Sequence, residues 1–222
     1  MSGHIIEVES LVKKYDGRSA VLDGISFSVD EQEFVTVHGK SGCGKTTLLN
    51  ILGGLDRPTR GRVAIDGEDI VEMSENDLAR LRLQKIGFVF QEYNLLMDLT
   101  IIENVQLPLR FSGRKDGGRT DRLLETFDIK HIADLTANKV SGGEAQRAAI
   151  ARALMNEPKV LLADEHTGNL DEENTKRVLD MFELARRDFG STIVLATHDA
   201  DVASRASRHI HIKEGKVISE EP

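Results

Sequence analysis

The sequence predicts an α/β fold with a mainly parallel sheet, a small antiparallel part and an inserted group of helices. Several of its apolar segments are continuous runs rich in Val, Ile and Leu, which are typical of strands buried on both faces. Helical patterns separate these runs along the 222 residues, and this alternation is characteristic of α/β proteins. Between residues 92 and 157 no strong strand pattern occurs, so we expect a mostly helical insertion there.

The expected elements follow one another along the chain. Apolar runs predict strands at residues 5–8, 20–29, 34–37, 62–65, 86–90, 160–163, 192–196 and 208–212. A period near 3.6 predicts helices at residues 45–52, 75–84, 121–127, 143–155 and 172–187. Asp-Gly pairs at residues 16–17 and 23–24 are turn signals between closely spaced early runs, which favours a small antiparallel sheet. A glycine-rich break at 112–118 divides the helical insertion.

The composition excludes several classes of protein. Hydrophobic residues make up 40% and charged residues 30%, as in globular rather than disordered chains. A net charge of −8 lacks the basic surface that attracts nucleic acid or anionic lipid, so we expect no nucleic-acid partner and only indirect membrane contact. No apolar run reaches the ~20 residues that cross a bilayer, and the first residues lack the apolar core of a signal peptide. We therefore expect a cytoplasmic protein.

A glycine-rich loop after the third predicted strand indicates a phosphate-binding site. Residues 39–46 read GKSGCGKT and match the pattern G-x-x-x-x-G-K-[ST] in full. Its glycines let backbone N–H groups converge on phosphate oxygens at the positive end of the following helix. We expect Lys45 to neutralise phosphate charge and the Thr46 hydroxyl to bind Mg²⁺. A plain glycine-rich turn is the alternative, but the complete pattern between a strand and a helix favours phosphate binding.

Two adjacent carboxylates end another apolar strand. Asp164 and Glu165 follow the run at residues 160–163. Because successive side chains of a strand point to opposite faces, the two carboxylates can have different roles. We expect Asp164 to hold Mg²⁺ and Glu165 to orient or deprotonate an attacking water. The alternative is a simple acidic end of a strand, which the neighbouring phosphate loop disfavours.

Residues 140–147, VSGGEAQR, predict a helix N-terminus of unusual composition. Ser141 and Glu144 have the spacing of a capping box, which is the purely structural interpretation. Gly142 and Gly143, however, each cost a helix about 1 kcal/mol relative to alanine. An ordinary cap does not need them, whereas a helix N-terminus that approaches a phosphate closely does.

These segments, in this order, resemble the motifs of ATP-binding cassette (ABC) proteins over essentially the whole chain. Further matches are Gln91 after the run 86–90, the loop 168–171, and His198 after the run 192–197. The resemblance implies a P-loop NTPase core with a mainly parallel sheet, a small antiparallel β subdomain and an inserted α-helical subdomain. It implies one nucleotide-binding domain over residues 1–222. The expected core is 1–91 and 157–222, with the helical subdomain at about 92–156.

The resemblance also implies roles for individual residues. Tyr15 would stack on adenine. The alternative is that the Tyr15 side chain simply covers the edge of the sheet. Gln91 would sense Mg²⁺ and the transport partner, His198 would hold the attacking water with Glu165, and Asp171 would contact a second subunit. The implied catalytic residues are Glu165, His198, Lys45 and Gln91, and the implied Mg²⁺ ligands are Thr46, Gln91 and Asp164. The implied ATP-binding residues are Tyr15, Gly39, Lys40, Ser41, Gly42, Cys43, Gly44, Lys45, Thr46, Thr47, Ser141, Gly142, Gly143, Glu144 and Asp171.

In this family the signature segment of one subunit faces the phosphate loop of another, which implies a head-to-tail dimer enclosing two ATP molecules. Residues 48–59, 103–105, 107–109 and 167–171 resemble the branch that serves lipoprotein release, macrolide export and cell division. This implies an ATPase subunit held on the cytoplasmic face of the membrane by integral-membrane permease subunits. A regulatory switch that moves no substrate is the alternative. A soluble cassette of DNA repair, translation or iron–sulphur assembly is disfavoured, because zinc-binding cysteine pairs, long coiled coils and a second cassette are absent.

Three positions depart from the branch, and two histidines stand apart from its motifs. Lys40 replaces a proline in the phosphate loop, and Glu144 replaces the more usual glutamine. His166 replaces the proline after Glu165, which frees a backbone N–H and is expected to affect the rate of hydrolysis rather than nucleotide binding. His209 and His211 share one face of a predicted strand, where we expect an exposed edge rather than a metal site.

Overall fold

The computed structural model of the protein describes residues 3–15, 19–164, 172–198 and 206–221. Its strands are β1 His4–Lys13, β2 Leu22–Asp30, β3 Phe34–His38, β4 Arg60–Ile65, β5 Glu68–Asp69, β6 Ile86–Val89, β7 Val160–Asp164, β8 Thr192–Thr197, β9 Arg208–Lys213 and β10 Lys216–Glu221. Its helices are α1 Lys45–Leu52, α2 Glu75–Lys85, α3 Ile101–Ser112, α4 Arg119–Thr126, α5 Gly142–Leu154 and α6 Glu172–Phe189. Two 3₁₀ turns, η1 Lys130–Ile132 and η2 Ala137–Lys139, precede α5.

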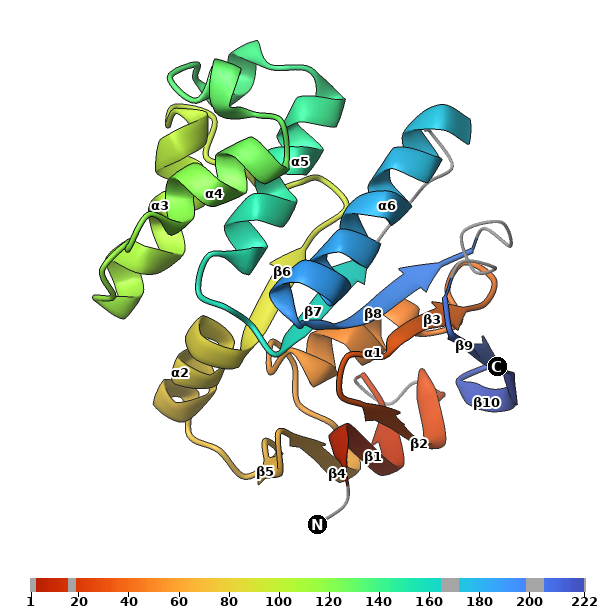
Figure 1. Ribbon diagram of the computed structural model, residues 1–222. Helices are drawn as coiled ribbons and strands as arrows, with labels where there is room; N and C mark the ends of the chain where they lie inside the picture. The colour runs from red at the N-terminus through yellow and green to blue at the C-terminus, as the bar shows by residue number, and fades with distance from the viewer. Residues whose placement is uncertain (1–2, 16–18, 165–171, 199–205, 222) are drawn as a thin grey trace.

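The strands form two sheets, as the sequence predicts. One sheet has six strands in the order β10-β9-β3-β8-β7-β6, parallel except for the antiparallel pair β9 and β10. The other has four antiparallel strands in the order β2-β1-β4-β5. Figure 1 shows the antiparallel strands at one end of the molecule and helices α3, α4 and α5 at the other, with the six-stranded sheet between them.

Hydrophobic residues cover both faces of the six-stranded sheet. Val35 and Val37 of β3 join one buried cluster with Leu48 of α1. Phe34, on the same strand, points into a second cluster and meets the ring of Phe182 of α6 at 6.5 Å between centroids. This two-sided burial explains why the strand sequences are continuously apolar rather than alternating.

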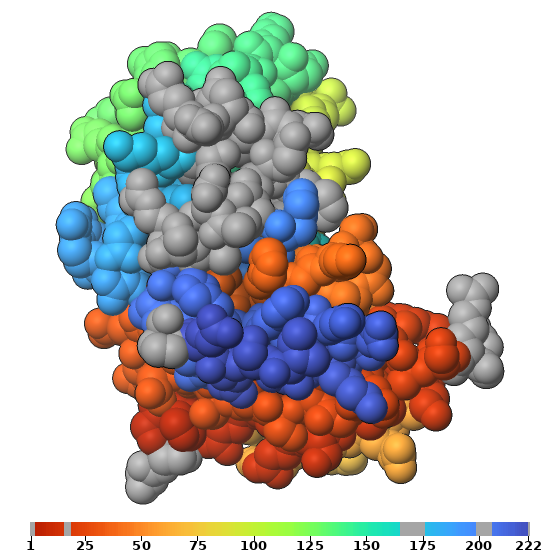
Figure 2. Space-filling model, turned by 90° about the vertical axis from the view of Figure 1, so that its right-hand side faces the viewer, coloured from red at the N-terminus to blue at the C-terminus, as the bar shows by residue number. Residues whose placement is uncertain are grey.

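Helix α3 is an element that the sequence pattern does not predict. Its interior contains Pro108, which lacks an N–H donor and normally interrupts a helix. A complete capping box between Thr100 and Glu103 starts the helix, and Asn156 Nδ2 donates to the Pro108 carbonyl at 3.1 Å. Capping and packing against α5 therefore outweigh the cost of the proline. Figure 2 shows the region of α3 to α5 (green) gathered above the C-terminal strands (blue).

The other differences concern the sheet edges. β5 and β10 are not predicted, because β5 has only two residues and β10 is mostly polar. The expected exposed edge at His209 and His211 is wrong, since β9 lies between β3 and β10 and both histidines are half-buried. None of the helices in the described ranges is long and apolar enough to cross a bilayer.

Candidate nucleotide-binding site

The loop between β3 and α1 keeps its shape because glycine occupies positions that no larger residue fits. Gly42 and Gly44 have positive φ angles of 79° and 108°. A Cβ atom at Gly44 would lie 2.6 Å from Leu22 Cδ2, and one at Gly39 would lie 2.3 Å from the Ile212 carbonyl oxygen. The loop backbone therefore packs directly against Leu22 and Ile212. It leads into the N-terminus of α1.

Lys45, the first residue of α1, lies back across this loop. Its Nζ donates to the Gly39 carbonyl at 2.6 Å and to the Lys40 carbonyl at 3.2 Å. The buried thiol of Cys43 lies 4.0 Å from the same nitrogen. No carboxylate of the described residues pairs with this ammonium group. Among the described residues, Lys45 Nζ contacts two carbonyl oxygens and the Cys43 thiol, and the N-terminus of α1 adds to the positive charge, which suits an anion such as phosphate.

A cavity of about 160 Å³ opens beside the loop and joins two of the predicted motifs. His198 enters it from the end of β8, which pairs in parallel with β3. Parallel strands bring their carboxyl ends to one edge of the sheet, so residues more than 150 positions apart in sequence meet there. The lining residues are Val21, Ser41, Gly42, Gly44, Lys45, Thr46, Thr47 and His198.

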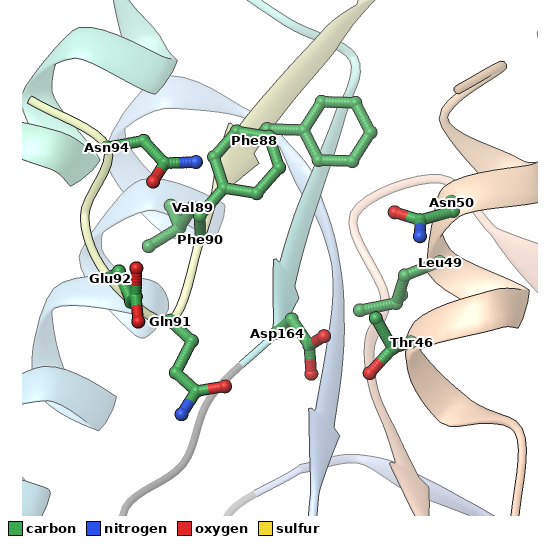
Figure 3. A pocket seen from close by; sticks show the side chains of 10 residues that line it. All are labelled: Thr46, Leu49, Asn50, Phe88, Val89, Phe90, Gln91, Glu92, Asn94 and Asp164. Atoms are coloured by element: carbon green, nitrogen blue, oxygen red, sulfur yellow. The ribbon is translucent and has the colours of Figure 1, made fainter. Parts of the chain in front are cut away.

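A second cavity, of about 200 Å³, brings together the three predicted Mg²⁺ ligands. Thr46 reaches it from α1, Asp164 from the end of β7, and Gln91 from just beyond β6. Figure 3 shows the Asp164 carboxylate between the Gln91 amide on one side and the Thr46 hydroxyl on the other. Hydroxyl, carboxylate and amide oxygens are the donors that Mg²⁺ prefers, so the chemistry of these three residues fits this ion.

Tyr15 is anchored by two residues, Asp56 and Lys13, for which the motifs predict no role of their own. Its hydroxyl donates to Asp56 Oδ2 at 2.6 Å, and Lys13 Nζ lies 4.6 Å from the centre of its ring. Lys13 also donates to Asp56 Oδ1 at 2.6 Å. Burial and the Asp56 carboxylate raise the pKa of the Tyr15 phenol, although a hydrogen bond with Thr47 acts in the opposite direction. Tyr15 is 40% exposed and lines neither cavity.

The segment at Ser141 forms the predicted capping box but takes no part in either cavity. The Ser141 hydroxyl and N–H both donate to Glu144 Oε2 at 2.7 Å, and these bonds hold the pKa of Glu144 below its ordinary value. A Cβ atom at Gly142 or Gly143 would find no atom closer than 3.8 Å. Packing within the chain therefore does not require glycine at these two exposed positions.

Three of the highlighted residues, Glu165, His166 and Asp171, lie outside the residues that the structure describes. Their expected roles stay predictions.

A group of histidines borders the phosphate loop, and the motif analysis does not connect them. The rings of His38 and His211 lie 5.3 Å apart, and His209 Nδ1 lies 2.8 Å from the Thr36 hydroxyl oxygen. Burial lowers the pKa of His38, and the nearby charges of His211 and Lys45 lower it further. The lowered pKa favours the neutral form of the His38 imidazole. Within the described ranges, no cluster of three such ligands fits a metal ion.

Comparison with known sequences gives a consistent family assignment. The profile of the family described as "ABC transporter" matches residues 22–168. The "Lipoprotein-releasing system ATP-binding protein LolD 1" of Chlorobium chlorochromatii is 44% identical over 204 residues, which are 90% of this chain and 83% of that protein. The "Macrolide export ATP-binding/permease protein MacB" of Campylobacter jejuni is 44% identical over 92% of this chain, but the match spans only 32% of that longer protein.

Comparison with solved structures gives the same family. The "Dimeric structure of a post-hydrolysis state of the ATP-binding cassette MJ0796 bound to ADP and Pi" superimposes with a TM-score of 0.88. It is 38% identical and covers 97% of both chains. The structure of "cbiO1 from clostridium perfringens", part of the "ABC transporter complex cbiONQ", gives a TM-score of 0.90 at 29% identity. It covers 99% of this chain and 88% of that one.

Proposed function

Since the chain belongs to the ABC transporter family, we propose that it is the ATPase subunit of a membrane transporter, in which ATP-dependent head-to-tail dimerisation moves the membrane subunits. It hydrolyses ATP to ADP and phosphate. The observation that carries this proposal is the convergence of Thr46, Gln91 and Asp164 on one cavity beside the phosphate loop. Their donor atoms come from three separate elements, and only the fold brings them together.

ATP is bound by residues of the two cavities together with Tyr15. Lys45 and the backbone N–H groups of residues 39–46 hold the phosphates, while the exposed ring of Tyr15 stacks on adenine. Thr46, Gln91 and Asp164 hold Mg²⁺, which when bound neutralises charge on the phosphate oxygens. Glu165 accepts a proton from the attacking water. His198, which lines the same cavity as Lys45, hydrogen-bonds the γ-phosphate and orients that water with Glu165.

A second copy of the chain completes each site. Ser141, Gly142, Gly143 and Glu144 of one subunit contact the ATP bound to the other, and Asp171 lies at the contact between subunits. Two observations support this arrangement. The glycines at the start of α5 are exposed and have no packing reason within their own chain. The similar cassette MJ0796 forms a dimer in its structure with ADP and Pi.

We propose residues 1–91 and 157–222 as the core and about 92–156 as the helical subdomain, with the membrane partner bound between them. A groove of about 620 Å³ supports this position, and we call it the lateral groove. It lies among α2, β6, α3 and α5, and its apolar lining includes Leu83, Phe88, Phe90, Leu107, Pro108 and Phe111. The lateral groove and the cavity of Gln91 share Phe88, Phe90 and Asn94, so a partner in the groove lies next to the nucleotide site.

The partners are integral-membrane permease subunits, and the cargo is of the lipoprotein, peptide or macrolide type. Relatives named for lipoprotein release and macrolide export support this class and favour transport over a purely regulatory switch. We place the protein at the cytoplasmic face of the membrane, held there by protein contacts. A net charge of −8 disfavours direct attraction to anionic lipid.

Affinity purification from native membranes tests this function. The tagged chain is expected to bring down integral-membrane permease proteins, identified by mass spectrometry, and the isolated complex is expected to hydrolyse ATP. Phe111→Ser should lose these partners, because Phe111 lines the lateral groove and is 75% exposed. Ile218→Ser is the matched control, since Ile218 is 52% exposed on β10 and lies outside the groove lining. Recovery of the wild-type chain without any permease would contradict the proposal.

A further inference from the structure

A cavity of about 370 Å³ lies where the chain passes from α3 to α4, and we call it the basic pocket. The chain as a whole is acidic, with 37 acidic and 29 basic residues. The lining of the pocket reverses this balance, since its charged side chains are Asp116, Glu157, Arg114, Lys115, Arg119 and Arg122. The pocket shares no lining residue with the two cavities of the nucleotide site or with the lateral groove. It is therefore a separate place of positive charge on an acidic protein.

Both carboxylates of the basic pocket are already engaged. Asp116 Oδ1 accepts hydrogen bonds from the N–H and from the hydroxyl of Thr120, each at 2.8 Å. It thereby caps the first turn of α4. Glu157 Oε1 accepts a hydrogen bond from Arg119 Nη1 at 3.0 Å. One of the four cations thus has an acidic partner in the pocket.

The other three cations lack such a partner. Within the described ranges, no carboxylate forms an ion pair with Arg114, Lys115 or Arg122. The charge of Arg122 acts on Asp188, but that carboxylate pairs with its neighbour Arg187 at 2.7 Å. The three positive charges are therefore available to an anion from outside the chain.

Arg119 is held in place at the inner wall of the basic pocket. Its side chain is 15% exposed and donates to two carbonyl oxygens at the end of α5, at 2.6 and 2.9 Å. Burial lowers the pKa of this guanidinium; Glu157 raises it, and the charges of Arg122 and Arg114 lower it further. The guanidinium groups are thus close enough to repel one another, and an anion placed between them removes this repulsion.

The basic pocket is open to a ligand. Arg114 is exposed and uses one of its five N–H donors, Nη1, for the Asn156 carbonyl at 3.0 Å. This bond fixes the direction of the side chain and leaves four donors. Beside the arginine, the backbone at Gly117 and Gly118 is uncovered, because a Cβ atom at either position would find no atom within 4 Å. A ligand can therefore reach both the guanidinium and the start of α4.

We propose that the basic pocket binds a phosphate-bearing anion through Arg114, Lys115 and Arg119. Guanidinium groups match the oxygens of a phosphate with pairs of hydrogen bonds, and the double charge of a phosphate suits several cations better than a single carboxylate does. The volume lies in the range of small-ligand sites, roughly 300–1,000 Å³. A soluble phosphate compound and the headgroup of an anionic phospholipid present the same group. Because the protein carries a net charge of −8, attraction to either depends on this pocket and not on the surface as a whole.

Titration with inorganic pyrophosphate, at constant ionic strength, tests the soluble source. In the nitrogen-15-labelled chain, the amide signals of Gly117 and Gly118 report on the basic pocket, and those of Gly42 and Gly44 report separately on the phosphate loop. We expect the signals of Gly117 and Gly118 to shift and to saturate. Absence of a shift at Gly42 and Gly44 would count against the phosphate loop and not against the basic pocket, so the two assignments fail independently.

Two matched variants show whether the charges of the pocket are responsible. Arg114→Gln with Lys115→Gln is expected to weaken pyrophosphate binding at the pocket by roughly tenfold or more and to leave the response of the phosphate loop unchanged. Arg80→Gln with Lys130→Gln removes the same amount of charge from exposed positions outside the lining, where both side chains pair with acidic neighbours. This control is expected to bind as the wild type does.

Co-sedimentation with vesicles tests the lipid source. The wild-type chain and both double variants are mixed with vesicles of phosphatidylcholine alone and with vesicles that also contain phosphatidylglycerol. Sedimentation that needs phosphatidylglycerol and is lost only in the pocket variant would identify the lipid headgroup as the ligand, whereas a pocket-dependent pyrophosphate response without sedimentation would identify a soluble phosphate compound. If neither probe binds, or if the pocket variant binds both as the control does, the inference is overturned.

Discussion

Lys45→Ala is expected to abolish tight ATP binding. Among the described residues, the Lys45 ammonium contacts two carbonyl oxygens and the Cys43 thiol, and no carboxylate competes for it. Its removal leaves the phosphates without their nearest fixed cation. Loss of one partner of a close charge pair costs about 2–5 kcal/mol, which is a weakening of at least about 30-fold. Calorimetric titration with ATP measures this effect.

Lys40→Ala is the matched control for that titration. Lys40 lies in the same loop, but its side chain is exposed, so solvent and salt screen its charge. We expect it to weaken binding only a few-fold, on the order of the small contribution of exposed charges. Both variants should unfold at nearly the wild-type temperature, because neither change touches the hydrophobic clusters. ATP affinity that is unaltered in Lys45→Ala would refute the assignment of the phosphate loop.

Glu165→Gln is expected to separate ATP binding from hydrolysis. The amide keeps the size of the side chain but does not accept a proton from water, so the rate of hydrolysis should fall by about 10²–10⁴-fold. ATP should bind as in the wild type, because the phosphate contacts that we propose come from residues 39–46. With hydrolysis blocked, the ATP-bound dimer should accumulate. Light scattering after size-exclusion chromatography, with and without ATP, measures the mass of the species.

Glu31→Gln is the matched control for this experiment. It changes the same chemical group in an exposed turn between β2 and β3. We expect wild-type hydrolysis and no ATP-dependent dimer that persists. A Glu165→Gln chain that binds ATP and elutes only as a monomer would defeat the dimer mechanism, and one that hydrolyses ATP at the wild-type rate would remove Glu165 from the catalytic role.

The strands that are buried on both faces are predicted well from the sequence. Strands β3, β7 and β8 are predicted within one residue of their observed ends, because both of their faces are buried and their sequences are continuously apolar. Helix α1 has the predicted bounds, since the glycine loop fixes its start. Sequence patterns do not reveal α3, in which tertiary contacts override Pro108, or β10, whose pairing with β9 does not depend on apolar side chains.

The candidate site also has a part that the sequence predicts and a part that it does not. Motif order and spacing predict that Thr46, Gln91 and Asp164 act together, and the structure places them around one cavity. The bonds of Asp56 to Lys13 and Tyr15 are not predictable from spacing, because they join residues more than 40 positions apart. Although burial alone would raise it, the pKa of Asp56 lies below its ordinary value because Lys13 and Tyr15 hydrogen-bond its carboxylate. Such contacts depend on tertiary structure that no local pattern encodes.

The central claim is that the phosphate loop of one chain and the Ser141 segment of another enclose the same ATP. Cysteine cross-linking between two differently marked chains tests it most directly. Both chains carry Glu165→Gln and Cys43→Ser; one adds Ser41→Cys in the exposed part of the phosphate loop, and the other adds Lys139→Cys, exposed just before Ser141. With ATP and a short bis-maleimide, the mixture is expected to give a cross-linked dimer, while either chain alone and the mixture without ATP give none. Cross-linking of either chain with itself, or an ATP-bound dimer of the mixture that does not cross-link, would contradict the head-to-tail arrangement.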